Sequence, residues 1–115
     1  MHSEIGLYTF TLILCFHFVA DFVLQSHWMA TGKSRRFGMN RQMVSHIAVY
    51  TIFLMPLGVV WALANGAAHY LVDAVTSTAT SALWKRNEYH WFFVVIGADQ
   101  LIHMLCLIWS YQWLT

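Results

Sequence analysis

Acidic and imidazole side chains fall inside strongly apolar stretches of this sequence, where they could bind a metal ion or move protons. They comprise three aspartates and four histidines: Asp21, Asp73, Asp99, His17, His46, His69 and His103. On membrane-insertion scales, an aspartate at the centre of an apolar helix costs about 2.5–3.5 kcal/mol, so such a side chain rarely faces lipid. We therefore expect these side chains to contact one another, water or a cation.

The spacing of the polar residues predicts that they share helix faces. Three series have members four residues apart: His17, Asp21 and Gln25; Asn65, His69, Asp73 and Ser77; Asp99 and His103. Residues four apart lie on one side of an α-helix. Gln100 adjoins the third series, and His46 adds a polar position on a further apolar stretch. If all of these residues face inward, a helical bundle acquires a single polar core.

A metal site is the chemistry that this set of residues favours. Neutral imidazole and carboxylate are good ligands for Zn²⁺, Mn²⁺ and Fe²⁺, and helical bundles build such sites from facing helices. The best candidate ligands belong to a His-x3-Asp motif that occurs twice: His17, Asp21, His69 and Asp73. We expect zinc first, with manganese or iron as alternatives. Two other interpretations stay open, a proton or ion path without a fixed metal and a purely structural polar core.

Catalytic roles fall to polar residues that the metal would leave free. A metal-bound water needs a general base, for which Asp99 is the first candidate, and His103 or His46 could protonate a leaving group. Six further residues could orient ligands or bind substrate: Gln25, Asn65, Gln100, Ser45, Thr76 and Ser77. Arg35 and Arg36 could attract an anionic substrate. The alternative is that their basic loop sets the membrane topology and touches anionic headgroups.

The elements that must position these residues are long apolar segments. The chain has 115 residues, of which 59% are hydrophobic and 10% charged, and its mean hydropathy is +0.56. Soluble domains carry about 25% charged residues, so the composition argues against a disordered chain, a nucleic-acid-binding protein and a disulfide scaffold. Four apolar segments cover roughly residues 5–25, 43–64, 67–84 and 91–114. We predict one all-α domain over residues 1–115, a bundle of four transmembrane helices.

Turn and charge signals complete the predicted topology. Pro56 is expected to kink the second segment, and Asn65–Gly66 to form the turn before the third. Every lysine and arginine lies after the first or the third segment: Lys33, Arg35, Arg36 and Arg41, then Lys85 and Arg86. Four spans place both basic loops on one side, which the positive-inside rule makes cytoplasmic. Both termini then face outward.

The chain also looks internally duplicated. Superposing the first His-x3-Asp motif on the second aligns His17 with His69 and Asp21 with Asp73, and it also aligns Lys33 with Lys85. The first and third segments would run in the same direction. The prediction is a parallel repeat of two helical hairpins related by an axis along the membrane normal.

Four polar blocks, in this order, carry a family resemblance: His17-x3-Asp21-Phe-x2-Gln25, then His46, then Asn65-x3-His69-x3-Asp73, then Asp99-Gln100-x2-His103. The pattern resembles a family of small bacterial and phage membrane proteins known as domain of unknown function 3307. The resemblance covers nearly the whole chain and implies a multi-pass protein of the bacterial inner membrane, but it implies no activity. A looser similarity is to membrane-bound proteins described as metal-dependent hydrolases, which also scatter His and Asp over short spans.

Three functions are compatible with these features. The leading expectation is metal-dependent hydrolysis of a lipid-like or membrane-delivered ester, phosphoester or amide. The alternative is a metal-ion or proton transporter that uses the same His/Asp core, and the third is a membrane interaction protein with a structural polar core. The expected partners are the lipid bilayer and its anionic headgroups, with no nucleic acid, and a homo-oligomer stays open.

Overall fold

The computed structural model describes residues 5–115, and this part of the chain is helical with no strand. The elements are α1 (Leu7–Phe18), the π turn η1 (Val19–Val23), α2 (His27–Gly32), the 3-10 turn η2 (Arg35–Gly38), α3 (Arg41–Leu54), the 3-10 turn η3 (Met55–Leu57), α4 (Val59–Lys85) and α5 (Tyr89–Leu114). The predicted all-α fold is therefore confirmed.

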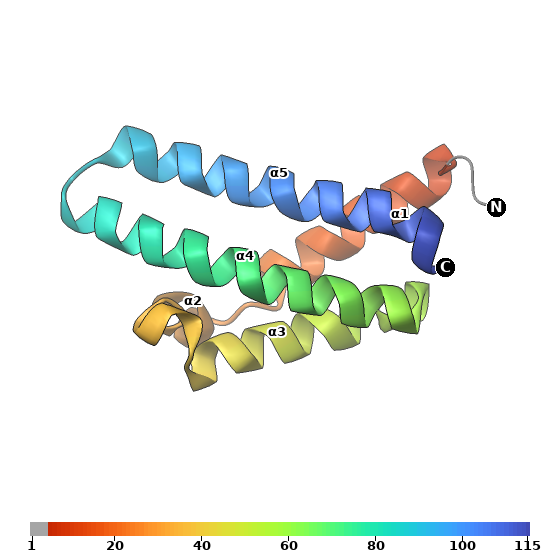
Figure 1. Ribbon diagram of the computed structural model, residues 1–115, viewed down its shortest axis with the longest axis horizontal. Coiled ribbons are helices and arrows are strands. Elements are labelled where there is room, and N and C mark those ends of the chain that lie inside the picture. Colours follow the sequence, from red (N-terminus) through yellow and green to blue (C-terminus); the bar gives the residue numbers. More distant parts are fainter. Residues whose placement is uncertain (1–4) are drawn as a thin grey trace.

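The four longer helices lie alongside one another in an up-and-down order (Figure 1). Helices α4 and α5 form a long antiparallel hairpin, α3 packs on α4, and α1 contacts both α3 and α5. Helices α1 and α4 run in the same direction (Figure 1). The segment around α2 and η2 and the turn between α4 and α5 lie at the same end of the bundle, opposite the C-terminus. Both basic segments therefore share one end, as the charge pattern predicts.

The turn predicted at Asn65–Gly66 is wrong, because α4 runs unbroken through both residues. The chain reverses earlier, where α3 ends, Pro56 lies in the 3-10 turn η3 and Gly58 has a φ of 155°. A Cβ added to Gly66 would clash with Thr51 Oγ1, so this glycine permits close packing of α3 on α4 instead of a turn. The second segment therefore ends before residue 59, and the third begins there.

The α1 helix ends in a π turn that contains Asp21. The amide of Leu24 donates to the carbonyl of Val19 at 2.9 Å, which closes a wider ring than an α-helical bond does. Such turns insert one extra residue into a helix and occur frequently at functional sites. Asp21 is buried in this turn.

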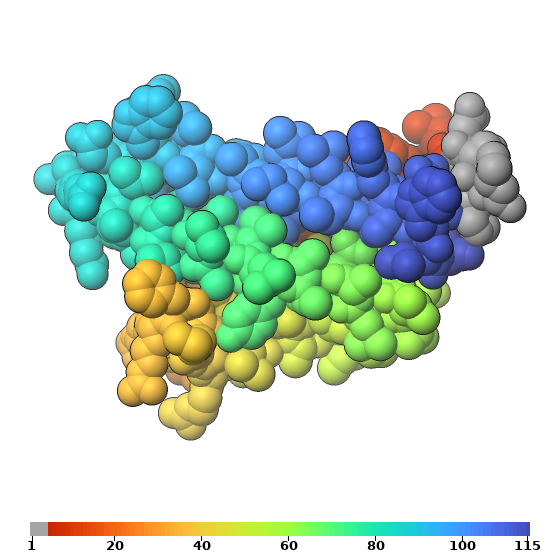
Figure 2. All heavy atoms as spheres, in the orientation of Figure 1, coloured from red at the N-terminus to blue at the C-terminus, as the bar shows by residue number. Residues whose placement is uncertain are grey.

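The polarity of the bundle is inverted compared with that of a soluble protein. Among residues 5–115, nine buried residues are polar or charged, against eight that are hydrophobic. Large apolar side chains lie outside instead, such as Leu71, Val75 and Trp109, which are 70%, 69% and 69% exposed. The space-filling view shows how closely the helices pack along their length (Figure 2).

Among residues 5–115, one helix is long and apolar enough to cross a membrane by length and composition, namely α5. A shorter apolar helix covers Leu7–Val23. The structure thus supports the predicted all-helical bundle, but by length and composition one described helix, instead of the four predicted, qualifies as a membrane span.

Candidate metal centre

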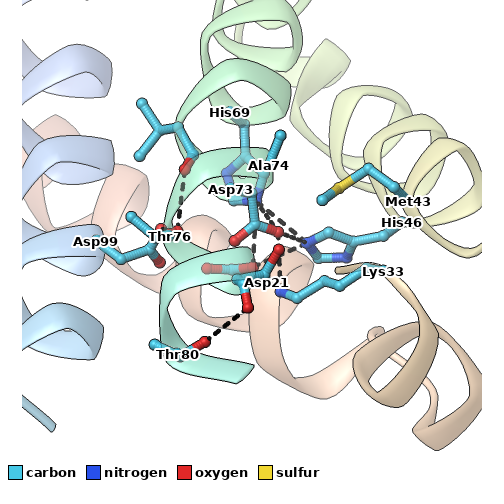
Figure 3. A network of polar contacts seen from close by, with 12 residues as sticks. Asp21, Lys33, Met43, His46, His69, Asp73, Ala74, Thr76, Thr80 and Asp99 are labelled. Carbon is cyan, nitrogen blue, oxygen red and sulfur yellow. Dashed lines mark hydrogen bonds and ion pairs between the residues drawn. The ribbon is translucent and has the colours of Figure 1, made fainter. Parts of the chain in front are cut away.

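Two histidines and two aspartates from three elements meet in the interior of the bundle (Figure 3). Asp21 comes from η1, His46 from α3, and His69 and Asp73 from adjacent turns of α4. Each of the four residues is at most 4% exposed. We refer to His46 Nε2, His69 Nε2, Asp21 Oδ1 and Asp73 Oδ2 as the four-donor set.

The separations within the four-donor set suit a tetrahedral ion. His46 Nε2 lies 3.1 Å from His69 Nε2, 3.1 Å from Asp21 Oδ1 and 3.4 Å from Asp73 Oδ2. His69 Nε2 lies 3.4 Å from Asp21 Oδ1 and 3.7 Å from Asp73 Oδ2. Donors at the usual zinc distances of about 2.0–2.1 Å stand roughly 3.3–3.4 Å apart in a tetrahedron. These five separations, each of which includes a histidine nitrogen, are close to those around one ion, and the ligand atoms of Asp21, His46 and His69 all lie within 4.8 Å of one another.

Aromatic packing orients the imidazole rings of this set. His69 is stacked on His103 with ring centroids 3.9 Å apart, and the ring of Tyr50 lies 4.0 Å away. The Nδ1 atoms of His46 and His69 are buried without a hydrogen-bond partner in the described part of the chain. This departs from the usual zinc site, where the second nitrogen donates to a carboxylate or carbonyl. The orientation of the His69 ring is fixed instead by its packing against the rings of His103 and Tyr50.

The electrostatic balance of the cluster favours a divalent cation. Asp21, Asp73 and Asp99 bring three carboxylates together, and Lys33 Nζ pairs with Asp73 Oδ2 at 2.8 Å. If the imidazoles are neutral, as metal ligation requires, three carboxylates and one ammonium leave a formal charge of −2. Buried carboxylates are costly unless they are paired or coordinate a metal. One divalent ion would neutralise the group.

A second polar group lies beside the first and is built around Asp99 on α5. Thr76 Oγ1 donates to Asp99 Oδ1 at 2.6 Å, and Gln100 Nε2 donates to Asp99 Oδ2 at 3.1 Å. Gln100 Nε2 also lies 3.1 Å from Asp21 Oδ2, so Gln100 joins the two groups. His103 Nε2 is 3.0 Å from Asp99 Oδ1, but the angles do not form a hydrogen bond.

The geometry separates His17 from the four-donor set and brings His46 into it. His17 Nδ1 is 3.0 Å from the hydroxyl of Tyr50, and its Nε2 is 2.8 Å from Gln100 Oε1. Its distance to Asp21 Oδ2 is 3.8 Å. Both ring nitrogens of His17 are therefore occupied by neutral partners. The positions do not favour the ligand role predicted for His17 or the acid role predicted for His46.

Two residues that contact the cluster, Tyr50 and Lys33, were not predicted from the sequence as site residues. Tyr50 follows His46 by four positions on α3, so the spacing that grouped the other residues could have found it. Lys33 lies outside the apolar segments, in the basic loop whose charge the sequence assigns either to membrane topology or to attraction of an anionic substrate. Its ammonium nevertheless reaches into the cluster from the segment after α2 (Figure 3).

A partly open cavity of about 300 Å³ reaches the cluster from the end that carries the basic segments. Its polar lining comprises Asp21, Gln25, Lys33, Asp73, Thr76, Ser77, Thr80, Asp99 and Gln100. On the opposite side, fully buried apolar side chains close the bundle, among them Ile13, Leu54, Trp61 and Leu107. The centre is therefore accessible from one end.

A comparison with protein families identifies the chain. Residues 9–115 match the family described as Protein of unknown function (DUF3307). The chain belongs to this family. No curated protein and no solved structure matches it. These comparisons do not show the looser similarity to membrane-bound metal-dependent hydrolases, and the description of the DUF3307 family specifies no activity.

The other predicted residues of this DUF3307 protein divide between three places. Gln25 and Ser77 line the cavity, and Gln25 Oε1 and Ser77 Oγ are buried without a hydrogen-bond partner in the described structure. Asn65 lies away from the cluster and donates to the carbonyl of Trp61 and to Ser110 Oγ, each at 2.9 Å. The remaining three, Ser45, Arg35 and Arg36, line a separate cavity at the surface.

Proposed function

We propose that the protein is a four-span membrane bundle whose metal centre hydrolyses a lipid-like or membrane-delivered ester, phosphoester or amide. The observation that carries this proposal is the four-donor set, in which the five separations that include a histidine nitrogen are 3.1 to 3.7 Å, close to those around a tetrahedral metal ion. Zinc is the metal we expect, with manganese or iron as alternatives.

The inverted polarity of the bundle supports the membrane location. Helices α4 and α5 have 27 and 26 residues, which corresponds to about 40 Å and exceeds the roughly 30 Å core of a bilayer. The polar residues that lower the hydropathy of α4 are buried, among them His69 and Asp73. Its exposed positions, such as Leu71 and Val75, are apolar and suited to lipid. Both basic segments at one end favour a cytoplasmic location of that end.

The shape of the cavity favours a reaction centre over a conduction path. A transporter needs access to its polar core from both sides of the membrane, in turn or together. Here the cavity opens toward the basic end, and Ile13, Trp61 and Leu107 are 0% exposed on the far side. A transport function would therefore require the apolar side of the bundle to open.

The residues around the cavity have positions suited to hydrolysis. A bound metal ion would activate a water molecule and polarise the scissile oxygen. Asp99 lies beside the four-donor set without belonging to it, so its carboxylate can accept a proton from water. His103 is the candidate acid for the leaving group. The ammonium of Lys33 lines the cavity and can stabilise negative charge on the substrate.

Elemental analysis combined with turnover tests the proposal. Protein purified in uncharged detergent without chelator is expected to contain about one zinc per chain. Asp99→Asn should keep the zinc and lose turnover on a panel of lipid esters, phosphoesters and amides. Absence of a stoichiometric transition metal in correctly folded protein would overturn the proposal.

Flux measurements distinguish the alternatives. Liposomes that contain the protein should show no metal- or pH-driven flux, whereas flux that Asp21→Asn abolishes would favour transport. If the zinc-free protein has full thermal stability and the donors tolerate isosteric replacement, the polar core is structural, and an interaction protein becomes the better explanation.

A further inference from the structure

A second cavity, of about 890 Å³, lies at the surface and is strongly cationic. Three arginines line it: Arg35, Arg36 and Arg41. Trp28, Asn40, Ser45 and Tyr70 contribute aromatic and uncharged polar groups. No acidic side chain from the described part of the chain lines this cavity. Its charge is therefore not compensated locally, and the chemistry that complements it is an anion.

The backbone that presents the arginines has a defined and strained conformation. Arg36, Phe37 and Gly38 have φ values of 50°, 56° and 84°, all in the left-handed region. For a residue with a side chain this conformation costs about 1–2 kcal/mol. Strain of this kind persists when surrounding contacts impose it, and it clusters at ligand-binding sites.

Side-chain contacts hold this segment in place. Asn40 Nδ2 donates to the carbonyls of Lys33 at 3.0 Å and Arg35 at 2.6 Å. The hydroxyl of Tyr70 on α4 donates to the carbonyl of Gly38 at 2.9 Å. A Cβ on Gly38 would lie 2.8 Å from Ala74 Cβ, so the segment is docked tightly against α4. A topology signal alone needs positive charge but no such fixed arrangement.

The surroundings of the cavity are apolar and exposed. Phe37 is 73% exposed, and Met39, Val44 and Trp28 at the cavity wall are 66%, 55% and 48% exposed. In Figure 2 the segment that carries these residues, coloured orange to yellow, projects from one end of the molecule. Cationic groups beside exposed aromatic and aliphatic side chains are typical of the boundary between headgroups and acyl chains.

We propose that this cavity binds the phosphate of an anionic phospholipid headgroup. The guanidinium groups would hold the phosphate oxygens through charge-assisted hydrogen bonds, while the acyl chains follow the exposed apolar side chains. Free inorganic phosphate would use the arginines alone and would leave the apolar wall without a role. The proposal does not depend on the metal centre, because none of the four donors lines this cavity.

Lipid retention by the detergent-solubilised protein tests the proposal. Native mass spectrometry in uncharged detergent measures the affinity for added phosphatidylglycerol, with phosphatidylcholine and inorganic phosphate as separate arms. Arg35→Gln combined with Arg36→Gln should weaken phosphatidylglycerol binding at least tenfold. Lys85→Gln combined with Arg86→Gln removes the same charge at the same end of the bundle, outside this cavity, and should change it less than twofold.

Three results would overturn the proposal. One is equal loss in both double variants, which indicates general electrostatic attraction. Another is equal retention of phosphatidylcholine and phosphatidylglycerol by the unmodified protein. The third is displacement of the lipid by millimolar inorganic phosphate, which indicates a site for the free anion. If the double variant does not fold, Arg41→Gln serves as an independent variant. The zinc content of each variant should equal that of the unmodified protein, so a loss of lipid binding is not caused by damage to the metal centre.

Discussion

Replacing His46 with alanine should weaken zinc binding far more than replacing His17 with alanine. Both histidines are buried, at 0% and 3% exposure, and both lie within the same polar core. His46 Nε2 contacts all three of the other atoms in the four-donor set at 3.1 to 3.4 Å. His17 directs its nitrogens at Tyr50 and Gln100. The two variants therefore form a matched pair in which one donor atom differs.

The expected magnitude follows from the number of donors. Four-ligand structural zinc sites bind with about 10–16 kcal/mol, or roughly 3 kcal/mol per donor. Loss of one donor then corresponds to about a 100-fold increase in Kd, since 1.4 kcal/mol is tenfold. At a free zinc concentration of 100 times the wild-type Kd, zinc stabilises the wild-type fold by about 2.7 kcal/mol. For His46→Ala the same concentration equals its Kd, and the stabilisation falls to about 0.4 kcal/mol.

A competition titration against a chromophoric zinc chelator measures the affinities, and thermal unfolding with and without zinc measures the stabilisation. His17→Ala loses a neighbour of the centre but no donor atom, and we expect at most a tenfold weaker affinity. The assignment of donors is refuted if His17→Ala loses as much affinity as His46→Ala. It is also refuted if His46→Ala binds zinc like the wild type while remaining folded.

Three further substitutions test the packing and the charge balance, each read out by thermal unfolding in detergent. Gly66→Ala should destabilise the protein by about 1–3 kcal/mol because its Cβ clashes with Thr51. Adding Thr51→Ala should recover part of this loss. If Thr51→Ala recovers none of it, Gly66 does not pack against Thr51. Lys33→Met leaves Asp73 without its ammonium partner and should lower the stability of the metal-free protein by about 3 kcal/mol. Zinc should then stabilise the variant more than it stabilises the wild type. An equal or smaller stabilisation by zinc would contradict the charge argument. Tyr50→Phe removes a buried hydrogen bond to an imidazole and should cost about 1 kcal/mol, and an unchanged melting temperature would show that the hydroxyl contributes nothing.

The sequence predicted the helices better than it predicted the turns. The apolar segments at roughly 5–25 and 91–114 correspond closely to Leu7–Val23 and Tyr89–Leu114. The middle of the chain was divided in the wrong place, because Asn65–Gly66 is a common turn sequence. What decides its conformation is contact with another helix, since Gly66 packs against Thr51. The actual reversal uses Pro56, from which the sequence predicts only a kink, and Gly58, to which the sequence analysis assigns no role.

The convergence of the polar residues followed from the sequence, whereas the close approach of His46 to Asp21 and Asp73 did not. Spacing at four residues fixes which face a side chain occupies, but it assumes a regular α-helix. The π turn after Phe18 widens the helix at Asp21 and changes its phase relative to His17. The His17–Asp21 separation of 3.8 Å is nevertheless similar to the 3.7 Å of the His69–Asp73 pair on the regular helix α4, so the spacing alone does not show which pair shares a ligand site. No local pattern predicts how far the ring of His46 reaches from α3 toward the centre.

The two copies of the His-x3-Asp motif contribute unequally to the centre. The copy on α4 supplies both His69 and Asp73 to the four-donor set, whereas the copy on α1 and η1 supplies Asp21. The imidazole of His46 completes the set from α3, which leaves the set open on the side of the second polar group and the cavity. A symmetric arrangement would add His17 to the set, but its ring nitrogens contact Tyr50 and Gln100 instead. If the set holds a metal ion as proposed, a substrate would approach it from the side of the cavity lined by Asp21, Asp73 and Asp99.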